Sequence, residues 1–102
     1  MLAFTKKYPK KRAFITGAAM GLGLSFCKFL AKEGWTIGMS DINQEKLEEA
    51  EKEIENLGGK ALIYILDVAD RKRYKYVVDD YLEKIGGIDL LVNNAGVGDG
   101  AA

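Results

Sequence analysis

The sequence predicts an α/β protein built on part of a doubly wound parallel sheet. Short apolar runs suited to strands alternate with segments of helical period, in the order β-α-β-α-β-α-β. A glycine-rich turn, Thr16–Gly23, joins the first strand to the first helix. Strands connected through helices run parallel with right-handed crossovers. We therefore expect about four strands in the order 3-2-1-4, with three helices.

Composition limits the classes of protein that this chain can belong to. The 102 residues allow one domain, and the formal net charge of zero gives no global attraction to nucleic acid or membranes. No apolar run approaches the roughly 20 residues that span a bilayer. The chain has no histidine and only one cysteine, Cys27, so we expect no metal site and a reducing, cytoplasmic location.

Residues 1–11 form a lysine-rich segment before the first strand. A signal peptide would need an apolar region after the basic residues, and none follows. We expect a basic, solvated leader, ranked ahead of a nucleic-acid-binding segment. The remaining residues, 12–102, are then expected to form an incomplete nucleotide-binding domain.

The first unit contains the predicted strand 12–16, the glycine turn and a helix over about 21–33. Apolar side chains recur in this helix at helical spacing and predict its buried stripe. The members of this predicted stripe are Leu22, Phe26, Phe29 and Leu30, with Cys27 and Ala31 beside it.

The later elements follow the same alternation. Asn43 and Asp70 are good N-caps for the second and third helices, and glycine pairs end both helices. The nearly continuous apolar run before Asp67 suits a strand that is covered on both faces. We expect strands over 35–40, 61–66 and 90–93, and helices over 44–57 and 71–85.

The glycine turn is the first candidate functional feature. A turn of this kind at a helix N-terminus points backbone N–H groups and the positive end of the helix dipole at an anion. Gly17 would permit the tight turn, Gly21 the approach of a phosphate, and Gly23 close packing of helix on strand. Glycines mark many turns, so this signal is weak until its place between strand and helix is considered.

Polar residues at the other strand ends add to this candidate site. Asp41 lies 20 positions after Gly21 and could accept hydrogen bonds from ribose hydroxyls, although it could also cap a turn. Its neighbours supply no cation for a 2′-phosphate, so NAD is favoured over NADP. Asp67 and Val68 could bind adenine or simply form a turn. The amides of 93–94 could contact a cofactor or tie strands together.

Together, these motifs resemble the classical short-chain dehydrogenases/reductases, from Arg12 to about Gly100. The resemblance implies a Rossmann-type NAD(P)-dependent oxidoreductase that transfers hydride between the nicotinamide and an alcohol or carbonyl. It also implies that Asn93 anchors the sheet. The bulk of Met20 departs from the small or basic residue usual there. The residues that the resemblance assigns to cofactor binding are Gly17, Ala19, Met20, Gly21, Leu22, Gly23, Asp41, Ile42, Asp67, Val68, Asn94, Ala95 and Gly96.

The family's proton relay has no counterpart in the sequence. That relay uses a serine and a Tyr-x-x-x-Lys pair, but neither Tyr76 nor Tyr81 has a lysine four residues later. We assign no catalytic residue and read the tyrosines as packing residues. We expect a fragment that is marginally stable and inactive on its own. The resemblance implies a homo-oligomer and a small-molecule alcohol or carbonyl substrate for the full-length form.

Three alternatives differ in what they would bind. A non-catalytic dinucleotide-binding module would bind NADH without turnover. An S-adenosylmethionine-dependent methyltransferase also places a glycine turn and an acidic strand end in an α/β sheet, although the Gly-x-x-x-Gly-x-Gly spacing argues against it. A structural or interaction fragment would bind neither.

Overall fold

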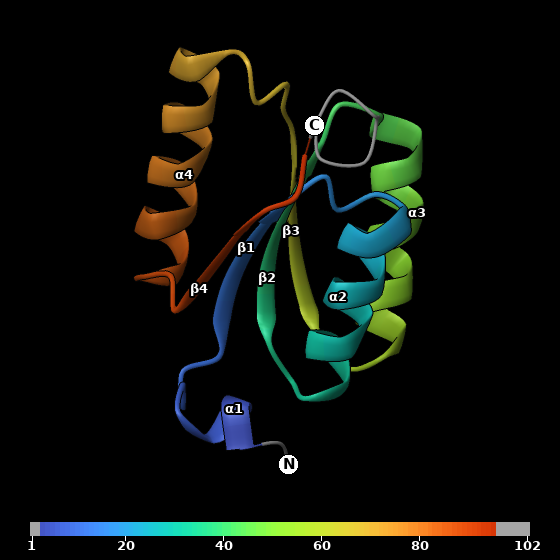
Figure 1. Ribbon diagram of the computed structural model, residues 1–102, viewed down its shortest axis with the longest axis vertical. Helices are drawn as coiled ribbons and strands as arrows, with labels where there is room; N and C mark the ends of the chain where they lie inside the picture. Colours follow the sequence, from blue (N-terminus) through green and yellow to red (C-terminus); the bar gives the residue numbers. More distant parts are fainter. Residues whose placement is uncertain (1–2, 96–102) are drawn as a thin grey trace.

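A single four-stranded parallel sheet organises the chain. The computed structural model describes residues 3–95 (Figure 1). The strand order is β3-β2-β1-β4, which confirms the predicted doubly wound α/β class and topology. The strands are β1 (Arg12–Thr16), β2 (Thr36–Asp41), β3 (Lys60–Ile65) and β4 (Leu90–Asn93); the helices are α1 (Ala3–Lys6), α2 (Gly21–Lys32), α3 (Gln44–Asn56) and α4 (Arg71–Ile85).

The sheet is covered on both faces. Helices α2 and α3 lie on one face and α4 lies on the other (Figure 1). Alternate residues of each strand serve the two faces, so Ile37 of β2 joins the α2 and α3 side while Phe14 of β1 packs with Tyr81 of α4. A Cβ at Gly38 would lie 2.5 Å from the Phe14 ring, so this ring occupies the space that a side chain would fill.

The predicted buried stripe of α2 is wrong in part. Leu30 is fully buried, but Leu22 is 76% exposed and Phe29 is 43% exposed. The side of α2 that meets the sheet carries smaller residues at the same helical period, because the helix and the strands approach closely there. The buried residues of α2 are Gly23, Cys27, Leu30 and Ala31.

The amino-terminal segment is not a wholly solvated leader. Thr5, in the short helix α1, is fully buried, and the indole Nε1 of Trp35 donates a hydrogen bond to its Oγ1 at 3.3 Å. The ring of Tyr8 meets Trp35 edge-on, with 6.2 Å between centroids. The lysines at 6, 7 and 10 are exposed, so within this segment the expected solvation holds for these basic side chains.

An ion pair joins the amino-terminal ends of β1 and β4. Arg12 Nε and Nη2 donate to the two carboxylate oxygens of Asp89 at 2.9 and 3.0 Å, and the Arg12 backbone N–H donates to the same carboxylate at 3.0 Å. The hydrogen bonds from the Arg12 side chain lower the pKa of Asp89. Both side chains are only 18% exposed, so water screens the pair weakly.

We predict that Asp89→Asn lowers the melting temperature by a few degrees at pH 7, because the paired charge is lost. The exposed Lys75–Asp79 pair provides the control, and Asp79→Asn should leave the melting temperature nearly unchanged. The contribution of Asp89 is complete above its unfolded pKa of about 3.9 and disappears as the pH falls through the lower folded value. Thermal denaturation between pH 2 and 7 checks this. Equal pH profiles for wild type and Asp89→Asn would contradict it.

Candidate site at the carboxyl edge of the sheet

All three glycines of the turn after β1 are required, Gly17 and Gly21 by their positive φ of 65° and 58° and Gly23 by close approach. Gly17 has φ 65°, and a Cβ there would lie 3.0 Å from Cα of Ala95. Gly23 begins the buried side of α2, and a Cβ there would lie only 2.0 Å from the carbonyl oxygen of Gly17. A side chain at Gly17 would therefore push the residues after β4 away, and one at Gly23 would push the first turn of α2 away from the end of β1.

The N-terminus of α2 is open to a ligand. Its N-cap residue, Met20, makes no side-chain cap hydrogen bond, and the first turn contains no acidic residue. In contrast, Asn43 caps α3 and Asp70 caps α4, each accepting a backbone hydrogen bond at 3.0 Å. A Cβ at Gly21 would meet nothing within 4 Å. The first N–H groups of α2 thus lack a side-chain cap, and the space beside Gly21 is free, which suits the approach of an anion.

Asp41 is held beside the turn. Its Oδ2 accepts a hydrogen bond from the Ala19 N–H at 3.0 Å, and its Oδ1 accepts one from the Asn43 N–H at 3.1 Å. The Ala18 N–H also donates to the carbonyl oxygen of Ser40 at 2.9 Å. The carboxylate is half-exposed and fixed in orientation, and each oxygen retains capacity for another donor.

Thr16 connects the turn to the end of β4, a role that the sequence analysis missed. Its buried Oγ1 accepts hydrogen bonds from the backbone N–H groups of Asn94 and Ala95 at 3.0 and 3.1 Å. The side-chain amide of Asn94 donates to the Gly17 carbonyl oxygen at 3.1 Å. The sequence offers one signal for this role, because Thr16 carries a hydroxyl group directly after the apolar residues of β1.

The ends of β3 and β4 supply the remaining predicted residues. Asp67 is exposed, and its Oδ1 accepts from the Ala69 N–H at 2.9 Å, which fits the turn interpretation. Val68 packs partly against the Phe14–Tyr81 side of the core. Asn93 accepts a hydrogen bond from the Tyr74 hydroxyl and so binds β4 to α4. Gly96 lies outside the described residues.

Three apolar side chains are exposed around the turn and Asp41. Met20, Leu22 and Ile42 are 50%, 76% and 69% exposed. All three belong to the predicted set. They provide apolar contact surface next to the open helix N-terminus.

The pKa shifts of Tyr64 and Tyr81 are upward, opposite to the lowering that would activate a tyrosine as a base. Burial raises the pKa of Tyr81, and burial followed by the hydrogen bond to Asp80 raises the pKa of Tyr64. The hydroxyl groups of Tyr64 and Tyr81 donate to Asp80 and to the Thr36 carbonyl oxygen. Tyr76 is 58% exposed with Arg73 over its ring, so its interpretation as a packing residue is wrong.

Residues 3–95 contain neither a metal-binding cluster nor a membrane-spanning helix. In this part of the chain, no group of histidine, cysteine, aspartate or glutamate side chains could hold a metal ion. None of the helices described has the length and apolarity to cross a membrane.

Comparison with known proteins identifies the family. The sequence profile of the short chain dehydrogenases matches residues 11–102. The chain is 46% identical over 87 residues to the 3-oxoacyl-(acyl-carrier-protein) reductase of Thermotoga maritima, and 44% identical over 87 residues to the cyclopentanol dehydrogenase of Comamonas sp.. Each alignment covers 85% of this chain but only 35% of the relative. The chain therefore belongs to the short-chain dehydrogenase family and spans about a third of the length of these relatives.

Solved structures agree with this assignment. A short chain dehydrogenase from Mycobacterium paratuberculosis bound to NAD has a TM-score of 0.81 at 31% identity, over 85% of this chain and 37% of that one. The L-sorbose reductase from Gluconobacter frateurii, complexed with NADPH and L-sorbose, has a TM-score of 0.79 at 38% identity, over 84% and 33%.

We predict that Gly23→Ala destabilises the fold by about 1–3 kcal/mol, because its methyl group overlaps the Gly17 carbonyl oxygen. Ser25→Ala, at an exposed position of the same helix, is the matched control and should be neutral or slightly stabilising. Urea denaturation followed by circular dichroism compares the two variants. Equal stability of the variants would show that the close approach is unimportant.

Proposed function

We propose that this chain is the cofactor-binding part of an NAD-dependent short-chain dehydrogenase that interconverts an alcohol and a carbonyl. The observation that carries the proposal is the uncapped N-terminus of α2, with free space beside Gly21 and the fixed carboxylate of Asp41 next to the turn. An anion-binding helix end and an acceptor for hydroxyl groups, side by side, match the pyrophosphate and the ribose of an adenosine diphosphate moiety.

Each part of the site would hold a different part of the dinucleotide. The turn from Gly17 to Gly23 would bind the pyrophosphate through backbone N–H groups. Asp41 would accept hydrogen bonds from the adenosine ribose, with Met20 and Ile42 as apolar surface beside it. Asp67 and Val68 would contact adenine. The proposed set also contains Ala19, Leu22, Asn94, Ala95 and Gly96.

The charge at Asp41 favours NAD over NADP. A 2′-phosphate would approach a carboxylate whose orientation is fixed by two backbone N–H groups, at 3.0 and 3.1 Å. Like charges in this position repel, and removing the charge should reduce the discrimination.

The chemistry needs more than these residues. A bound nicotinamide would accept or donate the hydride. Residues 1–102 would bind and orient the dinucleotide, while a proton donor and acceptor must come from other groups, since the sequence has no Tyr-x-x-x-Lys. We therefore propose cofactor binding without turnover for the isolated chain. The alcohol or carbonyl substrate would be bound by the full-length enzyme.

The buried Cys27 thiol, whose pKa is raised by desolvation to about 12, suits a reducing cytoplasm.

Titration of the chain with NADH, followed by cofactor fluorescence, tests this proposal. We expect saturable binding that NAD competes for, no binding of S-adenosylmethionine, and no NADH oxidation with diacetyl or cyclopentanone. Binding of the methyl donor alone would favour the methyltransferase alternative. Turnover would contradict the assignment of a binding part without catalytic groups.

We predict that Asp41→Asn weakens NADH binding about tenfold or more, because a charged acceptor for the ribose hydroxyls is lost. The ratio of NADPH to NADH affinity should rise, since the repulsion of a 2′-phosphate is removed. Asp79→Asn makes the same change of net charge at an exposed position of α4 and is the matched control. Equal NADH affinity for Asp41→Asn and wild type would refute the ribose role.

A further inference from the structure

A lysine-rich segment lies against the amino-terminal end of the sheet. Residues 3–10 include α1, and they precede the segment that matches the family profile, which begins at residue 11. Helix α1 lies beyond the amino-terminal ends of the strands, at one end of the longest dimension of the molecule (Figure 1). The matched part of the family fold therefore does not account for this segment.

Hydrogen bonds fix the backbone of the segment. The Oγ1 atom of Thr5 accepts a hydrogen bond from the indole Nε1 of Trp35, and both residues are fully buried. The Tyr8 N–H donates to the Thr5 carbonyl oxygen at 3.0 Å, and the Lys11 N–H donates to the Tyr8 carbonyl oxygen at 2.9 Å. Lys11 has a left-handed φ of 52°, and its carbonyl oxygen accepts from the Thr36 N–H at 2.8 Å. The lysines are thus displayed by a docked backbone.

The side chains that this segment presents to solvent are mostly cationic. Lys6, Lys7 and Lys10 are exposed, and Lys11 is half-buried. Among residues 3–95, none of the ion pairs includes any of these four lysines. The formal net charge of the whole chain is zero, so the four lysines give one end of the molecule a local positive charge.

We propose that Lys6, Lys7, Lys10 and Lys11, called here the lysine end, form a docking surface for an anionic lipid membrane. Lysine carries a compact charge on a flexible stem and lacks the planar fork of arginine, so it suits a diffuse anionic surface. Each lysine near such a surface strengthens binding about fivefold. A protruding end can meet a plane of headgroups, and this contact directs the opposite, cofactor-binding edge of the sheet away from the membrane.

Nucleic acid fits the lysine end less well. Readout of duplex DNA places a helix of several turns in the major groove, whereas α1 has only four residues. Single strands bind by stacking their bases on exposed aromatic rings. Here the ring of Tyr8 packs edge-on against Trp35, which is fully buried. The lysine end therefore offers charge without a means of holding bases.

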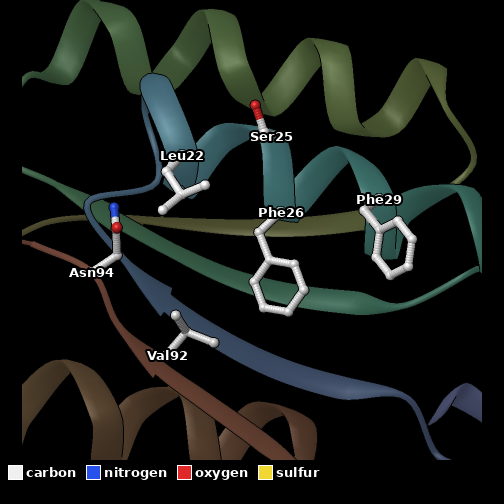
Figure 2. A pocket seen from close by; sticks show the side chains of 7 residues that line it. Leu22, Ser25, Phe26, Phe29, Val92 and Asn94 are labelled. Carbon is white, nitrogen blue, oxygen red and sulfur yellow. The ribbon is translucent and has the colours of Figure 1, made fainter.

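A protein partner also fits this surface less well. Protein–protein interfaces are depleted in lysine and enriched in arginine and aromatic residues. The next arginine in the chain, Arg12, is already paired with Asp89. Figure 2 shows Leu22, Phe26 and Phe29 projecting from α2 around an apolar hollow beside β4, and no residue of the lysine end lines that hollow. An anionic bilayer needs neither a groove nor an apolar anchor at this end.

Cosedimentation of the full 102-residue chain with lipid vesicles tests the proposal. We expect binding to mixed phosphatidylserine–phosphatidylcholine vesicles, none to pure phosphatidylcholine vesicles, and loss of binding in about 1 M salt, where charges are screened within about 3 Å. The double variant Lys7→Gln, Lys10→Gln should bind about twenty-five-fold more weakly, about fivefold for each lysine. The matched control, Lys52→Gln with Lys72→Gln, removes the same charge from exposed positions of α3 and α4 and should bind like the wild type.

Fluorescence of Trp35, the single tryptophan of the sequence, shows whether the segment remains docked during binding. We expect the same emission maximum with and without vesicles, because Trp35 stays buried. A red shift on binding would contradict the proposal, since it would show that the segment leaves Trp35.

Three further results would overturn the inference. One is equal binding to phosphatidylserine-containing and pure phosphatidylcholine vesicles. The second is equal binding by the two double variants. The third is binding to a DNA duplex without binding to phosphatidylserine-containing vesicles. None of these measurements uses NADH, so a negative result in the cofactor titration would leave this test intact.

Discussion

The contact between the start of α2 and the carbonyl oxygen of Gly17 determines the geometry of this fold at its functional edge. Gly23 leaves no room for a Cβ, since one would lie 2.0 Å from that oxygen, and the Asn94 amide donates to the same oxygen. The end of β1, the first turn of α2 and the end of β4 therefore meet at one backbone atom. The first N–H groups of α2 have no side-chain cap, and these are the groups that we propose bind a pyrophosphate.

Strands, helices and helix caps that depend on neighbouring residues in the chain were predictable from the sequence. Strands β1 and β4 and helix α4 occur at their predicted residues. Asn43 and Asp70 cap α3 and α4 as their side chains suggest, because each can accept a backbone hydrogen bond before the helix begins. The strand order followed from the helical connections, and the carboxyl-edge position of Asp41 followed from the strand order.

Features that depend on tertiary distance were not predictable in the same way. Helix α2 carries two neighbouring apolar stripes, and periodicity alone could not show that Cys27 and Ala31 would meet the sheet while Phe29 would remain exposed. The role of Thr16 depends on Asn94 and Ala95 at the end of β4, which lie 78 and 79 positions later in the chain. The burial of Thr5 depends in the same way on Trp35, which lies 30 positions away.

The central claim is that the N-terminus of α2 binds the pyrophosphate of a nicotinamide dinucleotide. Backbone amide chemical shifts, recorded while NADH is added to ¹⁵N-labelled protein, test it most directly. The account predicts that the largest shifts occur at the amides of Gly21, Leu22 and Gly23, with smaller ones at Ala19 and Asp41. Saturable binding that leaves these amides unmoved and shifts residues elsewhere would contradict the claim.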